Sequence, residues 1–324
     1  MKGDSMLRRL LLGGVIALTA AGCQSEPATN SASATESVVA AEFWSKVPEN
    51  DQQRDEVLRH TRRIDVCALL PRETLGQLTE FGAVRAVEND QPTSCEASLG
   101  PAGYLEGTKL KWSTNALPDQ FPQDRGTVRQ LGDITTWTVA SERRCSVTAR
   151  FPAGVGVYLD IETKTSTDLC ATIEGLVPGM LDRWRSGPQQ GTSPDTAPTV
   201  LHGADPCAVR GKLTGTVEFG VKRTLNGCGF TYRDEEVILT YENRYRRVLT
   251  AAATAVTIDG HDVYRSNPSG DNDPIRTYNA PVGPDLPQAE PSETFGPSVP
   301  IVSVHAASDD VAKEVVRQAL SLFS

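Results

Sequence analysis

A pattern of cysteines that occurs twice constrains the fold most. One Asp-x-Cys-Ala segment begins at Asp65 and another at Asp205, and each is followed by a second cysteine in a short extended segment, Cys95 or Cys228. Both copies continue with a glycine-containing strand signal, a late apolar strand and a closing amphipathic helix. Five features in the same order on both sides of one linker predict that the chain contains a duplicated domain.

The order of elements within each copy predicts the fold class. Segments that alternate apolar and polar residues precede the closing helix, as expected for antiparallel strands with one face in water. The predicted fold is α+β, with two tandem similar domains, each an antiparallel sheet with helices on one face and stapled by disulfides. The first domain is expected over residues 48–185 and the second over 202–324, joined by a proline- and glycine-rich linker at 186–201.

The cysteines also predict which disulfides form. One of the seven, Cys23, lies near the N-terminus, and the second copy holds only Cys207 and Cys228, which therefore pair. The equivalent cysteines of the first copy pair in the same way. Two cysteines then remain, and the second copy lacks the counterparts of both, as a bonded pair predicts. The expected disulfides are Cys67–Cys95, Cys145–Cys170 and Cys207–Cys228.

The first residues indicate export and a lipid anchor. Residues 1–22 have a basic start, a short apolar run and small residues before Cys23, which is typical of a signal peptide. The apolar run is too short to span a bilayer as a permanent helix. Residues 18–23 resemble a bacterial lipobox, which implies that Cys23 receives a diacylglycerol and becomes the first residue. Residues 23–47 are then the acylated cysteine and a flexible tether. The alternative is plain secretion.

Composition and motifs argue against several classes of chemistry. The net charge of −9 disfavours a nucleic-acid partner, which would require a basic surface. No histidine has metal-ligand spacing to another ligand, and motifs for nucleophilic catalysis or phosphate binding are lacking, so we expect no metal, no cofactor and no enzymatic activity. The most suggestive histidine is His261, which precedes Asp262. The four histidines are His60, His202, His261 and His305.

Two features of the second copy are not explained by folding alone. Four arginines surround its long strand, and they form either a solvated, charge-edged strand or an anion-binding face for a phospholipid head group or acidic glycan. Residues 267–300 contain eight prolines and are expected to form a long loop, either disordered or a docking arm. The four arginines are Arg233, Arg244, Arg246 and Arg247.

The lipobox, the tether and the Asp-x-Cys-Ala opening together resemble actinobacterial cell-envelope lipoproteins that carry a domain of unknown function. The family opening reads Asp-Pro-Cys-Ala-Leu-Leu. Residues 65–70 fit it except for Val66, whereas residues 205–209 keep the proline and lose the leucines. Members usually have one such unit. The resemblance implies a surface lipoprotein and supplies no catalytic residues.

These observations lead to one expected function and two alternatives. We expect a lipid-anchored binding or scaffolding module on the outer face of the cell membrane, with an envelope protein, glycan or lipid as its partner. The ligand is expected in a cleft between the two domains or beneath the proline-rich loop. A carrier or sensor of a lipid or small hydrophobic ligand would need an apolar cavity. An envelope hydrolase would need His261, Asp262 and a serine together in a cleft.

Overall fold

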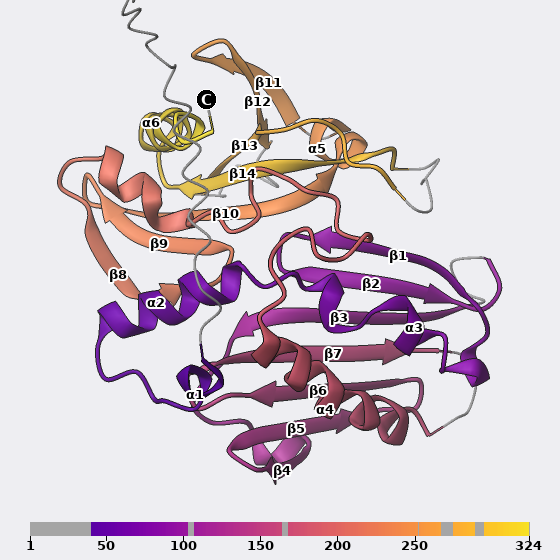
Figure 1. The fold of residues 1–324 in the computed structure, drawn as a ribbon. Coiled ribbons are helices and arrows are strands. Elements are labelled where there is room, and N and C mark those ends of the chain that lie inside the picture. The colour runs from indigo at the N-terminus through magenta and orange to yellow at the C-terminus, as the bar shows by residue number, and fades with distance from the viewer. Residues whose placement is uncertain are drawn as a thin grey trace, which may run out of the picture. The chain divides into compact units, whose positions relative to one another are not determined.

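Two seven-stranded antiparallel sheets form the framework of the described chain (Figure 1). The computed structural model describes residues 40–102, 107–163, 168–251, 253–266, 275–288 and 295–323, without the side chains of residues 123 and 218–223. The predicted signal peptide, Cys23 and the tether up to residue 39 lie outside these ranges. None of the helices in the described ranges has both the length and the apolar character required to cross a membrane.

The first sheet has the strand order β1-β2-β3-β7-β6-β5-β4. Its strands alternate as predicted: in β3, Leu110 and Trp112 are buried, whereas Lys109 and Lys111 lie on the other face. The strands are β1 Val84–Gln91, β2 Ser94–Leu99, β3 Thr108–Ala116, β4 Thr127–Leu131, β5 Ile134–Ala140, β6 Arg144–Arg150 and β7 Val155–Glu162.

The second sheet repeats the order of the first. Read from its β8 edge it runs β8-β9-β10-β14-β13-β12-β11, so the first three strands are followed by the seventh, sixth, fifth and fourth, as in the first sheet. The strands are β8 Val217–Arg223, β9 Gly227–Tyr232, β10 Glu235–Tyr245, β11 Ala253–Ile258, β12 His261–Ser266, β13 Arg276–Pro281 and β14 Ser298–Ala306. The α+β class and the antiparallel sheets predicted from the sequence are confirmed.

Helices begin where polar side chains can cap them. Asn50, Asp168 and Ser308 each accept a hydrogen bond from a backbone N–H of the first turn of α2, α4 and α6, respectively. α4 ends at Gly187, which has the left-handed conformation (φ 63°) that favours glycine. The helices are α1 Ala41–Trp44, α2 Asp51–Arg62, α3 Arg72–Leu75, α4 Leu169–Ser186, α5 Arg246–Ala251 and α6 Asp309–Leu320, and the 3-10 helices are η1 Cys67–Leu69, η2 Thr79–Phe81, η3 Gln123–Arg125 and η4 Pro206–Lys212.

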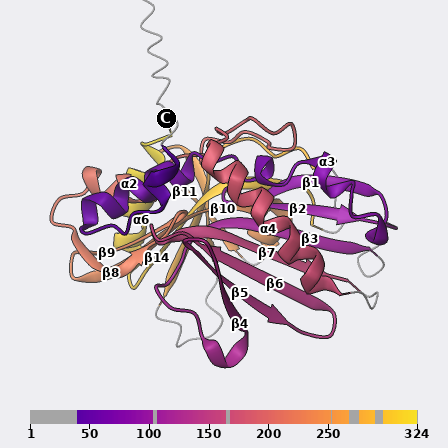
Figure 2. The same cartoon turned by 60° about the horizontal axis from the view of Figure 1, so that its bottom comes forward.

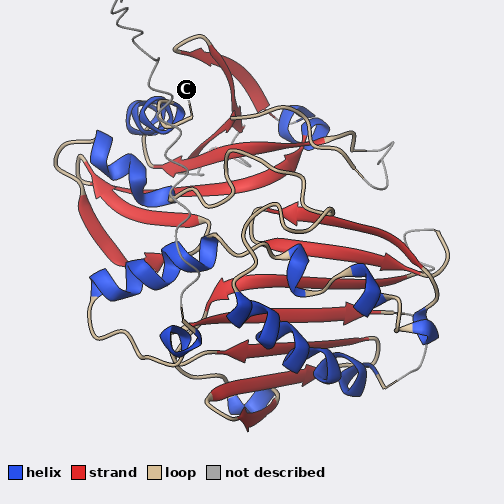
Figure 3. Ribbon diagram, viewed as in Figure 1, coloured by secondary structure: helices blue, strands red, loops and turns tan. Residues whose placement is uncertain are grey.

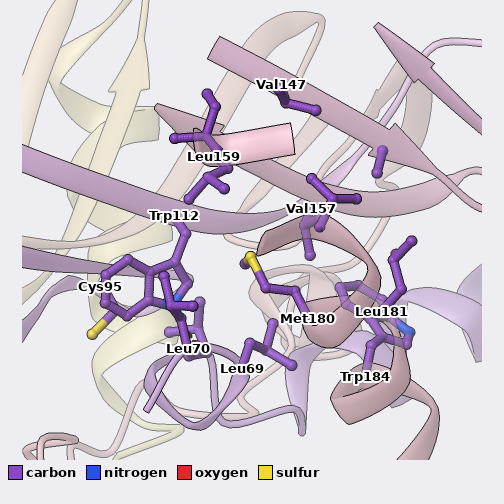
Figure 4. Close-up of a cluster of buried hydrophobic side chains, with 14 of the residues drawn as sticks. Leu69, Leu70, Cys95, Trp112, Val147, Val157, Leu159, Met180, Leu181 and Trp184 are labelled. Carbon is purple, nitrogen blue, oxygen red and sulfur yellow. Dashed lines mark hydrogen bonds between the residues drawn. The ribbon is translucent and has the colours of Figure 1, made fainter. Parts of the chain in front are cut away.

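The first core lies between its sheet and the long helix α4, which crosses one face of the sheet in both views (Figure 2; Figure 3). Trp112 of β3 points at η1 and donates its indole N–H to the Val66 carbonyl at 2.7 Å. Met180 and Trp184 extend from α4 into the same space, which Leu70, the residue after η1, closes (Figure 4). All four side chains are fully buried, so this layer is filled by the protein's own residues.

The second core repeats this arrangement with α6 as the closing helix. Val311, Val315 and Val316 recur at helical spacing, and all three are buried in the cluster that includes Val302 and Val304 of β14. The long helix and the sheet therefore have the same relation in both halves. The closing helices α4 and α6 are at the positions that the sequence predicts. The second sheet also carries a helix on its other face, because Leu249 of α5 packs with Val299 and Ile301, which point away from the side of Val302 and Val304.

The three disulfides are the pairs predicted from the cysteine pattern. Cys67–Cys95 joins η1 to the second strand of the first sheet, and Cys207–Cys228 joins η4 to the second strand of the second sheet. Cys145–Cys170 joins β6 to α4 and has no counterpart in the second half.

Two predicted boundaries differ from the structure. The tether was expected to continue to residue 47, but α1 precedes that point and Trp44 is 1% exposed, since its ring packs against Phe151 and Trp184. The expectation of one long loop over residues 267–300 is wrong, because β13 lies inside it. Tyr278 of β13 is buried in the second core, and its burial stabilises a strand although several prolines lie nearby in the sequence.

Candidate functional site

A charged cleft of about 890 Å³ lies where the two halves meet. One wall is a face of α2, which precedes the first sheet, and the other is η4 with its flanking residues, which precede the second sheet. This volume is within the usual range for small-molecule sites. Its charged lining residues are four arginines and three carboxylates, Arg59, Arg62, Arg63, Arg210, Asp55, Glu56 and Asp205.

The α2 wall follows from helical geometry. Positions 52, 55, 56, 59, 62 and 63 line the cleft at spacings of three and four residues, which place them along one face of a helix. Val57, Leu58 and Thr61 are buried on the other side of α2. The arginines occupy the last turns of the helix, where the helix dipole favours positive charge.

The η4 wall is built by the second Asp-x-Cys-Ala segment. The Asp205 carboxylate accepts the N–H of Cys207 at 3.0 Å, and Pro206 takes the first helical position, where a missing N–H has no cost. The disulfide to Cys228 then fixes this turn to β9. The motif therefore positions one side of the cleft.

Arg62 joins the two walls. Its Nε donates to the Leu225 carbonyl at 2.9 Å, and its Nη2 lies 3.2 Å from the Asp205 carboxylate. The Arg62 side chain is only 7% exposed. A buried guanidinium needs such partners, because an unpaired buried charge is strongly unfavourable. Arg62 therefore has a structural role at the base of the cleft.

His60 lies behind the cleft on α2. Burial lowers the pKa of its imidazole, and the neighbouring Arg59 guanidinium lowers it further, against a smaller opposing effect of Glu56. Arg59 Nη2 is 3.0 Å from His60 Nε2, a contact that suits a neutral ring accepting a hydrogen bond. The imidazole thus supports Arg59, whose guanidinium lines the cleft.

Further contacts fix the two halves around the cleft. The Gln91 side chain at the end of β1 donates to the Asn243 carbonyl and accepts the Asn243 N–H, both at 2.9 Å. The pairing of β9 with β10 ends at Thr240, so the Gln91 side chain bonds backbone groups of Asn243 that lie beyond the end of that pairing. The segment predicted as a linker is also held by the first half, since Asn89 Oδ1 accepts the Ala197 N–H at 2.8 Å.

The four arginines singled out in the second copy do not form one cluster. Arg233 lies in the β9–β10 turn, with its guanidinium 4.9 Å from the Tyr232 ring. At the other end of β10, Arg244 lies within the strand, and Arg246 and Arg247 follow it in α5. A strand of 11 residues makes that separation roughly 30 Å. Arg244 pairs with Glu242 at 3.0 Å, and Arg246 Nε pairs with Asp285 at 2.9 Å.

Arg247 lies in α5, beside Gly296. None of these four arginines is among the residues that line the charged cleft. All four arginines lie in or beside β10, as expected, but the length of β10 separates Arg233 from the other three, so the four do not share one anion-binding face.

Two of the remaining histidines are partly buried and structural. His202 Nδ1 accepts the Thr199 N–H at 3.1 Å, and burial lowers the pKa of the ring. Burial also lowers the pKa of His305, whose Nε2 is 3.3 Å from the Ser303 hydroxyl. That hydroxyl donates to Asn279 Oδ1 at 2.9 Å and Ser303 is fully buried, so His305 is not placed to activate it as a nucleophile.

His261 and Asp262, the pair that suggested a hydrolase, are exposed at the start of β12. Neither residue lines the charged cleft. Among the described residues, no group of three or more histidine, cysteine or acidic side chains is arranged to hold a metal ion.

The sequence interpretation missed the arginines of α2 and η4. Arg59, Arg62 and Arg63 follow Asp55 and Glu56 on one helical face. The spacing was visible in the sequence, but the opposing wall comes from residues far along the chain. Only the fold brings Arg210 to the same space.

Comparisons with known proteins assign no function to this cleft. No family model and no curated protein matches the chain. Among solved structures, the crystal structure of DynU16, a protein of the dynemicin biosynthetic locus, matches with 10% identity over 82% of this chain and 90% of that chain, at a TM-score of 0.14. A TM-score that low supports no argument about fold or function.

Proposed function

We propose that this protein is a lipid-anchored extracytoplasmic module that binds a polar ligand in the charged cleft between two tandem similar domains. The observation that carries the proposal is the cleft itself. It has the volume of a ligand site, lies at a junction of two folded units and collects four arginines. The proposal gives the protein a binding role and no catalytic one.

Duplication of one ancestral domain explains the internal similarity. Both sheets have the same strand order, both carry a disulfide from the opening 3-10 helix to the second strand, and both end in a helix packed on the sheet. If the two halves had arisen independently, each would have had to acquire the same strand order, the same disulfide and the same closing helix. The cleft then uses the opening segment of the second copy and the helix that precedes the first.

The location is supported by the N-terminal sequence and by the disulfides. The signal-peptide pattern of residues 1–22 and the resemblance to a lipobox at Cys23 support a position outside the cytoplasm, on the outer face of the membrane. Disulfides persist in oxidising compartments, and this chain has three. We therefore propose that the binding partner is an envelope component.

The lining of the cleft favours this function over a carrier of lipids or small hydrophobic ligands. The first core is filled by Trp112, Met180 and Trp184, all fully buried. The cleft has charged walls, which an apolar ligand would desolvate without compensation. A polar ligand has matching partners there.

A cleft-blocking variant tests the binding role. Gly211 lines the cleft, and a Cβ at that position would meet no atom within 4 Å, so Gly211→Trp fills the space without displacing the backbone. Gly175→Trp on α4 is the matched control, since it also has open space around it but lies away from the cleft. Native mass spectrometry after incubation with envelope extract should show small molecules bound to the wild type and to the control only. Equal retention by Gly211→Trp would refute the cleft as the site.

A separate experiment tests the anchor. Cys23→Ala should move the protein from the membrane fraction to the medium, because one covalent lipid attachment would be lost. Persistence of the variant in the membrane fraction would contradict lipidation and leave the binding proposal to be judged on the cleft variants.

A further inference from the structure

The charge of the cleft differs from that of the whole chain. The chain has a formal net charge of −9, whereas the cleft walls carry four arginines against three carboxylates. A guanidinium has five N–H donors, so an arginine that pairs with a carboxylate still has donors for a second acceptor. The cleft is thus a local excess of positive charge and of N–H donors in an acidic protein.

The arginines approach the cleft from both walls. Arg59 of α2 and Arg63, the residue that follows α2, are one turn apart, and Arg210 comes from η4 on the opposite wall. A phosphate group presents several acceptor oxygens and suits arginines converging from different directions, whereas a carboxylate is planar and is commonly held by one guanidinium. This arrangement favours a phosphate group over a carboxylate.

The remaining lining residues indicate the body of the ligand. Gln52, Asp55 and Thr216 contribute amide, carboxylate and hydroxyl groups, which exchange hydrogen bonds with hydroxyl groups. No aromatic and no large aliphatic side chain is among the lining residues in the described part of the chain. A polyhydroxylated body fits such walls better than an apolar one.

We propose that the cleft binds a polyol phosphate, in which arginines hold the phosphate and the neighbouring polar side chains hold the hydroxyl groups. The inference rests on the proposed binding function and specifies the ligand class of the same site. The same chemistry occurs in a free sugar phosphate and in a phosphorylated polyol head group of a lipid. The lipid anchor proposed at Cys23 would keep the cleft close to a bilayer that could present such head groups.

Calorimetry with defined probes tests the ligand class. Glucose 6-phosphate should bind the wild type, whereas glucose should bind at least about tenfold more weakly, since one charge-assisted set of hydrogen bonds is missing. Arg59→Gln and Arg63→Gln should each weaken glucose 6-phosphate binding by about tenfold. Arg54→Gln is the matched control, because Arg54 is on the same helix but pairs with Asp51 at 2.7 Å outside the cleft. The melting temperature of each variant verifies that it is folded.

Sedimentation with vesicles distinguishes the two sources. Binding to phosphatidylcholine vesicles only when they contain phosphatidylinositol, lost in Arg63→Gln and kept in Arg54→Gln, would support a lipid head group. Equal binding of glucose and glucose 6-phosphate would overturn the inference while leaving the cleft as a binding site. Failure of the phosphate probe and of the vesicles to bind would also overturn it, whereas ligand retention in the Gly211→Trp experiment decides the proposed function separately.

Discussion

The two halves of the molecule share one strand order but use their opening aspartates differently. In the first half Asp65 is fully buried and accepts bonds from the Ser193 N–H at 2.8 Å and the Thr196 hydroxyl at 2.6 Å, both in the connecting segment. In the second half Asp205 is half exposed and meets Arg62 of α2. Each aspartate also accepts an N–H of its own 3-10 helix. The motif keeps its local role and differs in the distant group that it holds.

A second difference concerns the link between the sixth strand and the closing helix. In the first half this link is covalent, from Cys145 in β6 to Cys170 in α4. In the second half the Tyr278 hydroxyl of β13 donates to the Asp309 carboxylate at the start of α6, at 2.7 Å. A hydrogen bond therefore occupies the topological place of a disulfide. The comparison indicates that this contact supports the fold in both halves, at different strengths.

The largest expected effect comes from removing the covalent link. The double variant Cys145→Ala/Cys170→Ala should lower the free energy of unfolding by about 3–4 kcal/mol, since the disulfide closes a loop of 25 residues in the unfolded chain. Urea denaturation followed by circular dichroism measures the loss. If the loss is no larger than that of Tyr278→Phe, which removes the hydrogen bond of the second half, the disulfide and the hydrogen bond contribute equally to stability.

The next effect tests the two aspartates. Asp65→Ala should cost about 2–4 kcal/mol, because it leaves buried donors of the connecting segment without an acceptor. Asp205→Ala should cost about 1–2 kcal/mol, since it removes a cap on an exposed turn and one partner of Arg62. Thermal unfolding of both variants gives the ranking. The reverse order would contradict the view that Asp65 carries the more buried junction.

Sequence reasoning reached the framework of this molecule and expected a cleft between its two halves, but it missed the residues that line the cleft. The disulfides, the α+β class and the closing helices follow from short-range patterns, such as cysteine number and the spacing of Val311, Val315 and Ala319. The strand β13 was missed because prolines surround it, although Tyr278 and Ala280 have the two-residue spacing of side chains on one face of a strand. The cleft depends on contacts such as Arg62 with Leu225, whose partners lie far apart in the chain. No local pattern encodes such a pairing.

A smaller effect is expected from the hydrogen bond of the second half. Tyr278→Phe should lower the free energy of unfolding by about 1–2 kcal/mol, because the buried ring is kept and only a bond to a charged acceptor is lost. Tyr158→Phe is the matched control on the outer face of the first sheet, where the hydroxyl makes a long contact of 3.4 Å to Asp160. The same denaturation measurement applies. A cost equal to that of the control would remove Tyr278 as the counterpart of the disulfide.

The smallest effect is a pH dependence from two partly buried histidines. Burial lowers the folded-state pKa of His202, beside the junction, and of His305 in the second sheet, below the value of 6.5 for an unperturbed ring. The unfolded chain therefore binds protons more readily than the folded one. The contribution of the two neutral rings to the free energy of unfolding is fully present above about pH 6.5, and it is lost as the pH falls toward their folded-state pKa values. His202→Asn and His305→Gln should each lose less unfolding free energy than the wild type when the pH is lowered from about 7 to about 5, which urea denaturation at each pH measures. His261→Gln, at an exposed position of β12, is the control. If the pH dependence of the free energy of unfolding is the same in His202→Asn as in the wild type, protonation of His202 is not coupled to unfolding.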